Sequence, residues 1–263
     1  MKFAIITDIH LGPEGHHKGV LRKMNKDVKI YLDNFVKEMN NKIKPEFVVV
    51  LGDLIEQDNK IKDKEHINYI VQLLKKLRCT VYYVAGNKDL KNISEEELSK
   101  LFHQKSLYYA FDSGRFHFIV LFSKVSEDRT SWVEGEQKIW LQKELDTTNK
   151  KCVVFVHHGL ADQDLTGNPW FEGMPENCLI ANRKDIRNII STSNKVIAVF
   201  NSHLHWDKQH IHDGVPYFSI QSLVENEADK GMASETHAVV NIVNDKVDVE
   251  VKGNHPKKIL TSI

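Results

Sequence analysis

Five short apolar runs in this chain are each followed, within a few residues, by an Asp, Asn or His side chain. The runs read FAII, FVVVL, VYYVA, VVFV and VIAVF, and their β-branched and aromatic residues are typical of buried strands. In open α/β sheets, the loops beyond the carboxyl ends of the strands converge on one rim, and binding sites form there. The pattern therefore predicts an α/β fold that gathers polar side chains at one edge of its sheets.

The side chains at these strand ends are all possible metal ligands. Asp8 and His10 are spaced so that both can face one ion, because alternate residues of an extended segment share a face. The carboxylate of Asp53 has two oxygens and can bridge two cations. A mixture of imidazole nitrogen and carboxylate oxygen favours Mn, Fe, Zn or Co over Ca or Mg alone. The candidate set is large enough for two ions and consists of Asp8, His10, Asp53, Asn87, His157, His203 and His205.

Length, charge and cysteine content restrict the class of protein. The 263 residues suffice for one large α/β domain, and because no linker divides them we expect a single domain over residues 1–263. The 36 basic residues are balanced by 36 acidic ones, which argues against a nucleic-acid partner. The N-terminus lacks a signal-peptide pattern, no apolar run approaches a membrane span of roughly 18 residues, and the three cysteines form no CxxC pair. We therefore expect a cytoplasmic protein without a membrane partner, of unknown oligomeric state.

Strand and helix patterns alternate in the first half of the chain, whereas hairpin patterns dominate its last third. Residues 20–39 and 67–77 place apolar side chains at helical spacing, and Ser94 with Glu97 predicts a capping box. Residues 159–178 have little periodicity, which predicts a long loop of the kind that is often functional. Further helices are expected around residues 140–145 and 185–190, and hairpins over residues 107–122, 208–220 and 237–251.

The order of the polar motifs resembles that of the calcineurin-like metallophosphoesterases. Asp-x-His, Gly-Asp, Gly-Asn-x-Asp, His-His and His-x-His follow one another from Asp8 to His205. The compact layout, with a Gly- and Pro-rich excursion between His157-His158 and the last motif, is most similar to the cyclic-nucleotide and glycerophosphodiester phosphodiesterase branch. The resemblance implies a four-layer fold in which two mixed β-sheets pack as a sandwich flanked by helices, with the site at the rim formed by the strand ends.

The resemblance also implies a ligand set and a reaction. One transition-metal ion (Mn, Fe or Zn) would be bound by Asp8, His10, Asp53 and His205, and a second by the bridging Asp53, Asn87, His157 and His203. A hydroxide formed between the two ions would attack phosphorus in line, while the ions neutralise charge on the phosphoryl oxygens. The implied activity is hydrolysis of a small phosphoester, with a phosphodiester as the first expectation.

The catalytic set that the resemblance implies contains one departure from the family. Asn87, Lys88, Asp89 and His158 are its members, with His158 expected to contact the substrate or to support the ligands. Where the family has a His that contacts the phosphoryl group and assists the leaving oxygen, this chain has Lys88. A lysine ammonium is ordinarily a poor proton donor at neutral pH, so we predict slow reaction of esters with poor leaving groups.

A second departure lies outside the catalytic set. Ser202 replaces the usual Gly before the last motif, which predicts that the backbone there does not need positive φ.

Other functions share these motifs. A phosphomonoesterase or a nucleotide pyrophosphatase would have the same metal core, and a nuclease would too, although the balanced charge argues against it. From a different class, a non-catalytic metal-binding scaffold would keep the fold without turnover, and Lys88 is the feature that favours it. Metal content together with turnover of a generic phosphodiester separates the scaffold from the enzymes.

Several aromatic and histidine side chains have two interpretations. Trp170 and Phe171, in the loop over residues 159–178, either cover the site or anchor the loop in the core. His16 and His17 lie in a Gly-rich segment and either line the substrate pocket or face solvent. The remaining histidines in strand patterns, which we interpret as structural, are His117, His210 and His212.

Overall fold

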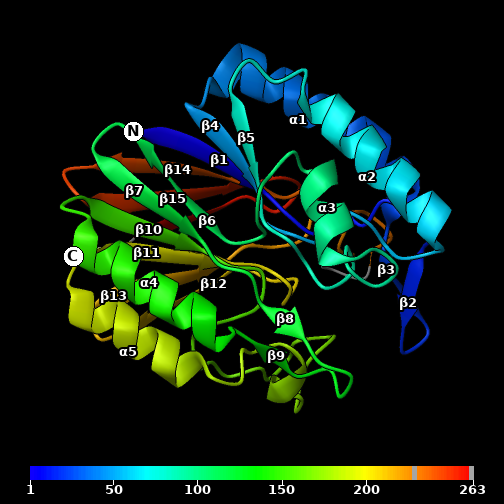
Figure 1. Cartoon of the computed structure of the whole chain (residues 1–263). Coiled ribbons are helices and arrows are strands. Elements are labelled where there is room, and N and C mark those ends of the chain that lie inside the picture. The colour runs from blue at the N-terminus through cyan, green and yellow to red at the C-terminus, as the bar shows by residue number, and fades with distance from the viewer. Residues whose placement is uncertain (227–229, 261–263) are drawn as a thin grey trace.

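A computed structural model describes residues 1–226 and 230–260 and shows two six-stranded mixed sheets packed face to face (Figure 1). The first sheet has the order β16 (Lys257–Leu260), β15 (Lys246–Lys252), β14 (His237–Val243), β1 (Lys2–Ile6), β4 (Phe47–Val50) and β5 (Thr80–Tyr83). The second has the order β12 (Lys208–His212), β13 (Val215–Ser219), β11 (Val196–Asn201), β10 (Lys151–Phe155), β7 (Phe116–Val120) and β6 (Tyr109–Ser113). The predicted sandwich of two mixed sheets is confirmed.

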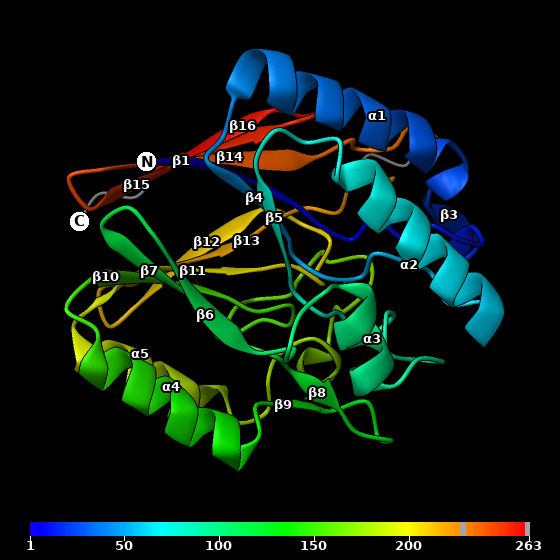
Figure 2. The same ribbon diagram turned by 45° about the horizontal axis from the view of Figure 1, so that its top comes forward.

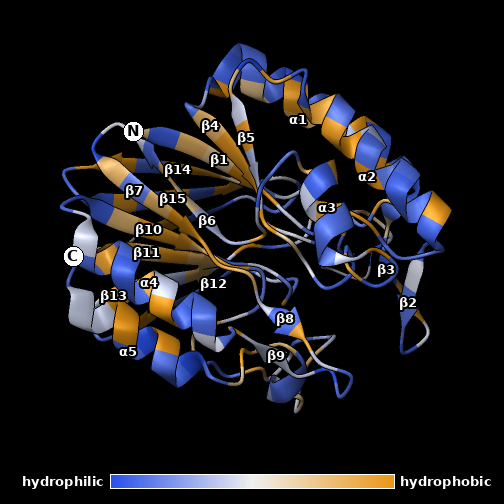
Figure 3. Ribbon diagram, viewed as in Figure 1, coloured by the Kyte–Doolittle hydropathy of each residue, from blue (hydrophilic) through white to orange (hydrophobic). Residues whose placement is uncertain are grey.

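Helices cover the outer face of each sheet. The long helices α1 (Val28–Glu38) and α2 (Lys60–Leu74) lie over the first sheet, and α4 (Gly135–Thr147) and α5 (Arg183–Ser193) lie over the second (Figure 2). The short helix α3 (Glu95–Leu101) begins at the capping box that Ser94 and Glu97 form, as predicted. Figure 3 shows mainly hydrophobic strands between helices of mixed hydropathy, which is the pattern expected when each helix buries one face.

The core between the sheets is rich in aromatic side chains, which face inward because alternate residues of a strand point to opposite faces of its sheet. Phe3 of β1 faces the second sheet, where its ring centroid lies 5.8 Å from those of Phe118 and Phe155. Its neighbour Ala4 points the other way, into the core beneath α1 and α2. Both faces of β1 are therefore buried, which explains its unbroken apolar sequence. The two sheets share this core, and the single domain over residues 1–263 stays a prediction.

Parallel pairing brings the predicted ligands to one rim. In the first sheet β1 pairs in parallel with β4, and β4 with β5. In the second sheet β10 pairs in parallel with β11. The carboxyl ends of these five strands therefore open toward the same edge of the sandwich, where the connecting loops meet.

One predicted helix differs from the structure in its bounds. The helix expected over residues 20–39 begins only at Val28, because Val20–Lys23 forms strand β3, which pairs with β2 (Gly15–His17) across a turn with positive φ at Lys18 and Gly19. Backbone pairing in this hairpin outweighs the helical spacing of its apolar residues. Lys257 and Lys258 are exposed and begin edge strand β16, a position where charged side chains discourage pairing with other molecules. The segment 124–133 contains the two-residue strands β8 (Lys124–Val125) and β9 (Ser131–Trp132).

The other predicted elements lie where the sequence placed them. The three hairpins are present as β6–β7, β12–β13 and β14–β15, each paired antiparallel. No helix within residues 1–226 and 230–260 is long and apolar enough to cross a membrane.

Candidate metal centre

The ligand candidates stand on strained loops at the strand ends. Five of them have positive φ: Asp8 (47°), His10 (48°), Asp53 (50°), His203 (69°) and His205 (53°). Non-glycine residues avoid this region because the Cβ atom crowds the backbone, at a cost of about 1–3 kcal/mol each. Such strain in five members of one set indicates that the backbone is bent here to direct side chains inward. Ser202, in contrast, is not among the positive-φ residues, as predicted.

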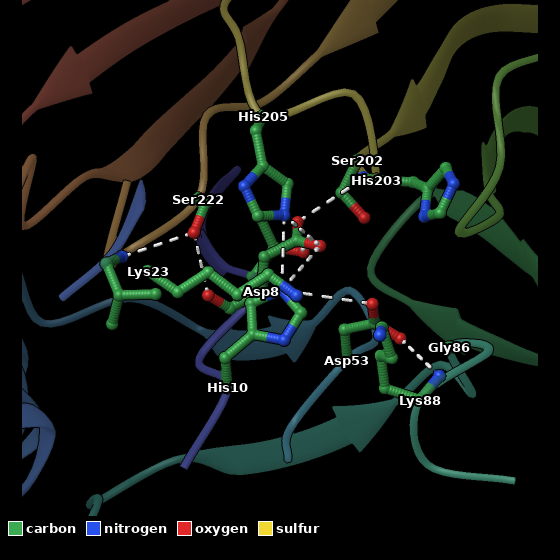
Figure 4. Close-up of polar contacts among 12 residues, drawn as sticks. Asp8, His10, Lys23, Asp53, Gly86, Lys88, Ser202, His203, His205 and Ser222 are labelled. Atoms are coloured by element: carbon green, nitrogen blue, oxygen red, sulfur yellow. Dashed lines mark hydrogen bonds and ion pairs between the residues drawn. The ribbon is translucent and has the colours of Figure 1, made fainter. Parts of the chain in front are cut away.

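Asp8, His10 and His205 form a first cluster (Figure 4). The Nε2 atoms of His10 and His205 lie 3.1 Å apart, and Asp8 Oδ1 lies 3.4 Å from His205 Nε2 and 3.8 Å from His10 Nε2. Thr7 Oγ1 donates a hydrogen bond of 2.9 Å to the other carboxylate oxygen of Asp8. Asp8 Oδ1 itself is buried and has no hydrogen-bond partner. The unpartnered Asp8 Oδ1 and two nitrogens that contact each other therefore converge on one point.

A second cluster surrounds His157. Its Nε2 lies 3.2 Å from Asn87 Oδ1 and 3.4 Å from Asp53 Oδ1. The His203 ring lies beside it, with 5.0 Å between the ring centroids. His158 is also close, 4.3 Å from the His203 centroid, and its Nδ1 lies 2.7 Å from Ser123 Oγ. The geometry thus brings together the four residues expected for the second ion, and it adds His158 as a possible ligand beside them.

Asp53 lies between the clusters. Its Oδ1 faces His157, and its Oδ2 lies 3.9 Å from His10 Nε2. The backbone N–H of Lys88 donates a hydrogen bond of 2.8 Å to Oδ1 and fixes the carboxylate. One oxygen toward each cluster is the arrangement that a bridging ligand requires.

Two glycines allow this close approach. A Cβ atom at Gly52, which has φ of 98°, would overlap the His157 imidazole, and a Cβ atom at Gly86 would overlap Asp53. The Gly in each Gly-Asp and Gly-Asn motif is therefore required by space at the centre.

Carboxylates orient two of the imidazoles from behind. His205 Nδ1 lies 2.6 Å from Glu225 Oε2, and His10 Nδ1 lies 3.1 Å from Glu56 Oε2. A carboxylate at one ring nitrogen fixes the ring and leaves the other nitrogen available to a metal. Neither glutamate was found from the sequence, because each lies in a segment that carries no ligand spacing. Glu56 comes three residues after Asp53, and Glu225 follows β13.

Carbonyl groups orient the other two imidazoles. His157 Nδ1 lies 3.0 Å from the Leu51 carbonyl oxygen, which also accepts a 2.7 Å hydrogen bond from the Ser202 hydroxyl. His203 Nε2 lies 3.2 Å from the carbonyl oxygen of Asn177. Since each of these rings can donate one N–H to a carbonyl, its other nitrogen remains free to face the centre.

The charges at the centre are strongly coupled. Burial alone would raise the pKa of Asp8, but the neighbouring His205 outweighs it and lowers the pKa to about 2. Burial opposes a charge on His157 and His205 as well, yet Asp53 and Asp8 raise their pKa values to about 9. Protons on these imidazoles therefore take the place of cations between the carboxylates, and a metal ion must displace them.

This donor set fits transition-metal ions. It combines imidazole nitrogens, carboxylate oxygens and one amide oxygen, all buried or nearly so, with the unpartnered Asp8 Oδ1 at its middle. Such a buried polar atom without a partner is costly in a folded protein unless something binds it.

Two of the predicted catalytic residues, Lys88 and Asp89, lie on different sides of the centre. Lys88 lines the cavity above the centre and places its Nζ 2.9 Å from Glu56 Oε1. Asp89 lies beneath the centre, fully buried, where its oxygens accept hydrogen bonds from the backbone N–H groups of Leu54 (2.8 Å) and Gly86 (2.9 Å). Burial, followed by the charge on Asp53, raises the Asp89 pKa to about 8. These hydrogen bonds hold the Asn87 loop against the Asp53 loop, and a catalytic role of Asp89 stays a prediction.

A cavity of about 1250 Å³ lies over the centre. Trp170 and Phe171 form part of its wall, with the Phe171 ring 4.9 Å from His203 and Trp170 Nε1 donating a 2.9 Å hydrogen bond to Glu225. His17 lines the same cavity and packs on Trp170 at 4.9 Å. The loop over residues 159–178 thus reaches the cavity and is also anchored to Glu225, the carboxylate that orients His205.

The histidines that we interpreted as structural lie elsewhere. His117 on β7 bonds Asp112 through Nδ1 at 2.7 Å, and His212 on β12 lies 3.2 Å from the Asp162 carbonyl oxygen. Neither they nor His210, also on β12, line the cavity over the centre. His16 of β2 is exposed and does not line it either.

Comparisons with known proteins find relatives and similar folds. The human manganese-dependent ADP-ribose/CDP-alcohol diphosphatase is 23% identical over 326 aligned positions, which cover 98% of this chain and 92% of that protein. Among solved structures, a dimetal phosphatase from Danio rerio superposes with a TM-score of 0.78 at 16% identity and covers 99% of both chains. A purple acid phosphatase from yellow lupin seeds superposes with a TM-score of 0.68 at 12% identity, over 98% of this chain and 52% of that one. At these identities the superpositions show the fold.

The family itself is shown by sequence. The family model for calcineurin-like phosphoesterases matches residues 1–207, the segment that contains every predicted ligand. The chain therefore belongs to the calcineurin-like phosphoesterase family.

Proposed function

We propose that this chain hydrolyses a small phosphoester by means of two bound transition-metal ions. The observation that carries the proposal is the position of Asp53, with one oxygen toward the His10 cluster and the other toward His157. In the proposed assignment Asp8, His10, Asp53 and His205 hold one ion, and Asp53, Asn87, His157 and His203 hold the other.

The ions, when bound, supply a water of lowered pKa and positive charge for the phosphoryl oxygens. The chain's own residues position these parts. Glu225 and Glu56 fix the rings of His205 and His10, and the Lys88 N–H fixes Asp53. Trp170 and Phe171 cover part of the cavity and reduce the access of bulk water.

A diphosphate-linked substrate is the form of this function that we favour. The human relative is named a manganese-dependent ADP-ribose/CDP-alcohol diphosphatase, and this chain covers 92% of its length. That name supports manganese as the first metal to test and nucleotide pyrophosphatase activity, one of the alternatives considered from the sequence. The similarity to the cyclic-nucleotide and glycerophosphodiester branch stays a prediction.

A substrate panel tests the proposal. Metal-free protein is loaded with Mn²⁺, Fe²⁺ or Zn²⁺ in turn and assayed on ADP-ribose, bis(4-nitrophenyl) phosphate and 4-nitrophenyl phosphate. We expect metal-dependent turnover, highest with Mn²⁺ and with the diphosphate. Protein that binds two ions and turns over none of the three substrates would favour the non-catalytic scaffold.

A further inference from the structure

Two lysine side chains meet on one carboxylate at the edge of the metal centre. The Lys88 ammonium lies 2.9 Å from Glu56 Oε1, and the ammonium of Lys23 contacts Oε2 of the same carboxylate. Glu56 Oε2 also lies 3.1 Å from His10 Nδ1. Because two ammonium groups share one carboxylate, Lys23, Lys88 and Glu56 together carry one net positive charge. We call these three residues the lysine pair and its carboxylate.

The lysine pair is fixed beside the ligands and borders the cavity. The backbone of Lys88 bonds Asp53, and Figure 4 shows the two residues side by side. Lys23 Nζ lies 5.2 Å from the centroid of the Trp170 ring. Both lysines line the cavity of about 1250 Å³ together with His10 and Asp53. An anion that occupies the cavity next to these ligands is therefore within reach of both ammonium groups.

The burial of Lys23 makes this charge unusual. Only 5% of the residue is exposed, and burial lowers the pKa of its ammonium while Glu56 opposes that effect. A buried ammonium is unfavourable unless a partner compensates it. One lysine is enough to compensate Glu56, and Asp53 attracts the Lys23 ammonium as well, so a bound anion adds a further partner for the second ammonium.

We propose that the lysine pair binds the second phosphate of a diphosphate-linked substrate, the phosphate that leaves. This inference rests on the proposed phosphoester hydrolysis and specifies its substrate class as compounds with a P–O–P linkage. The water oxygen forms a bond to the attacked phosphorus, and the bond from that phosphorus to the bridging oxygen breaks. The electron pair stays on the bridging oxygen, which departs with the second phosphate, and the two water protons pass to the products or to solvent.

Charge placement explains why lysines suit this position. The departing phosphate gains negative charge as the bridging bond breaks, and a fixed ammonium stabilises that charge without transferring a proton. A phosphodiester without a second phosphate places no anion there and gains nothing from the pair. The pair therefore selects diphosphates over simple diesters that occupy the same metal centre.

Kinetics of one variant on two substrates test the proposal. Lys88→Gln removes one ammonium from a side chain that is 26% exposed. Lys64→Gln is the matched control, because Lys64 also shares a carboxylate, that of Glu97, with a second lysine but does not line the cavity. We expect Lys88→Gln to lower kcat/KM for ADP-ribose by on the order of ten- to a hundredfold, the effect of losing a charge-assisted hydrogen bond. Its kcat/KM for bis(4-nitrophenyl) phosphate should change much less, Lys64→Gln should alter neither value, and Lys88→Arg should keep most of the activity on ADP-ribose. Equal losses on the two substrates, or no loss on either, would overturn the proposal.

A binding measurement tests it without turnover. Calorimetry measures the affinity of Mn²⁺-loaded protein for α,β-methylene ADP and for AMP, which lacks the second phosphorus group. Elemental analysis afterwards checks that the metal is retained. Wild-type protein should bind the first ligand at least tenfold more tightly, and Lys88→Gln should lose most of that difference while Lys64→Gln keeps it. An unchanged ratio in Lys88→Gln refutes the subsite even in an active enzyme. Absence of turnover with the expected ratio would instead contradict only the proposed function.

Discussion

Replacing Glu225 with Gln should weaken metal binding without unfolding the protein. Glu225 is 1% exposed, and its Oε2 lies 2.6 Å from His205 Nδ1 and 2.9 Å from Trp170 Nε1. Gln keeps the shape and an oxygen that can accept these hydrogen bonds, but it removes the negative charge that makes the imidazole a better ligand. Loss of such a supporting carboxylate typically lowers metal affinity by about 10- to 100-fold, or roughly 1.4–2.8 kcal/mol.

Calorimetric titration with Mn²⁺ measures this effect against a matched pair elsewhere in the fold. His117 and Asp112 also form a His–carboxylate contact, of 2.7 Å, outside the metal centre, so Asp112→Asn is the control. We expect weaker affinity in Glu225→Gln, unchanged affinity in Asp112→Asn, and melting temperatures that confirm folding of both. Affinity that is unchanged in Glu225→Gln, or lowered equally in the two variants, would refute the orienting role of Glu225.

Three further outcomes follow from the site. Trp170→Ala should raise KM for large substrates by several-fold and lower kcat less, because the ring forms part of the cavity wall, and steady-state kinetics measure both constants. Lys88→His should accelerate alkyl phosphodiesters, by up to 10²–10⁴-fold where general acid catalysis is fully expressed, and should help aryl esters much less. In metal-free protein His157 and His205 have pKa values raised from 6.5 to about 9. The contribution of their protonated rings to the free energy of unfolding is therefore complete below pH 6.5 and is lost as pH rises through 9. The melting temperature of the metal-free protein should therefore fall over this range, and the rise in melting temperature that Mn²⁺ produces should become larger. A Mn²⁺-induced rise that does not depend on pH would contradict the displacement of protons by metal.

The strands and the ligand candidates could be predicted because their signals are local. Each ligand candidate follows an apolar run, and parallel pairing of buried strands places all such positions at one rim. The capping box of α3 could be found for the same reason, since Ser94 and Glu97 are three residues apart on the chain. The fold class and the candidate metal centre could thus be predicted from residues that lie close together in the sequence.

The supports of the site could not be predicted because they depend on contacts between distant segments. Glu225 meets His205 across 20 residues and Trp170 across 55, and nothing in the sequence around Glu225 marks it as a partner of either. Lys23 was expected in a helix, whereas β3 pairing turns its side chain toward Glu56. The surroundings of Asp89 were also not predicted, because only the packed loops show that backbone N–H groups donate to its carboxylate.

Metal content of wild-type protein and of Asp53→Asn tests the central claim most directly. Elemental analysis after loading with Mn²⁺ should find two ions per chain in the wild type, because Asp53 presents one oxygen to each cluster. Asp53→Asn replaces a bridging carboxylate with a neutral amide and should lose most of the metal and nearly all hydrolysis, while His117→Asn keeps both. An Asp53→Asn protein that holds two ions and retains activity would contradict a two-metal centre bridged by Asp53.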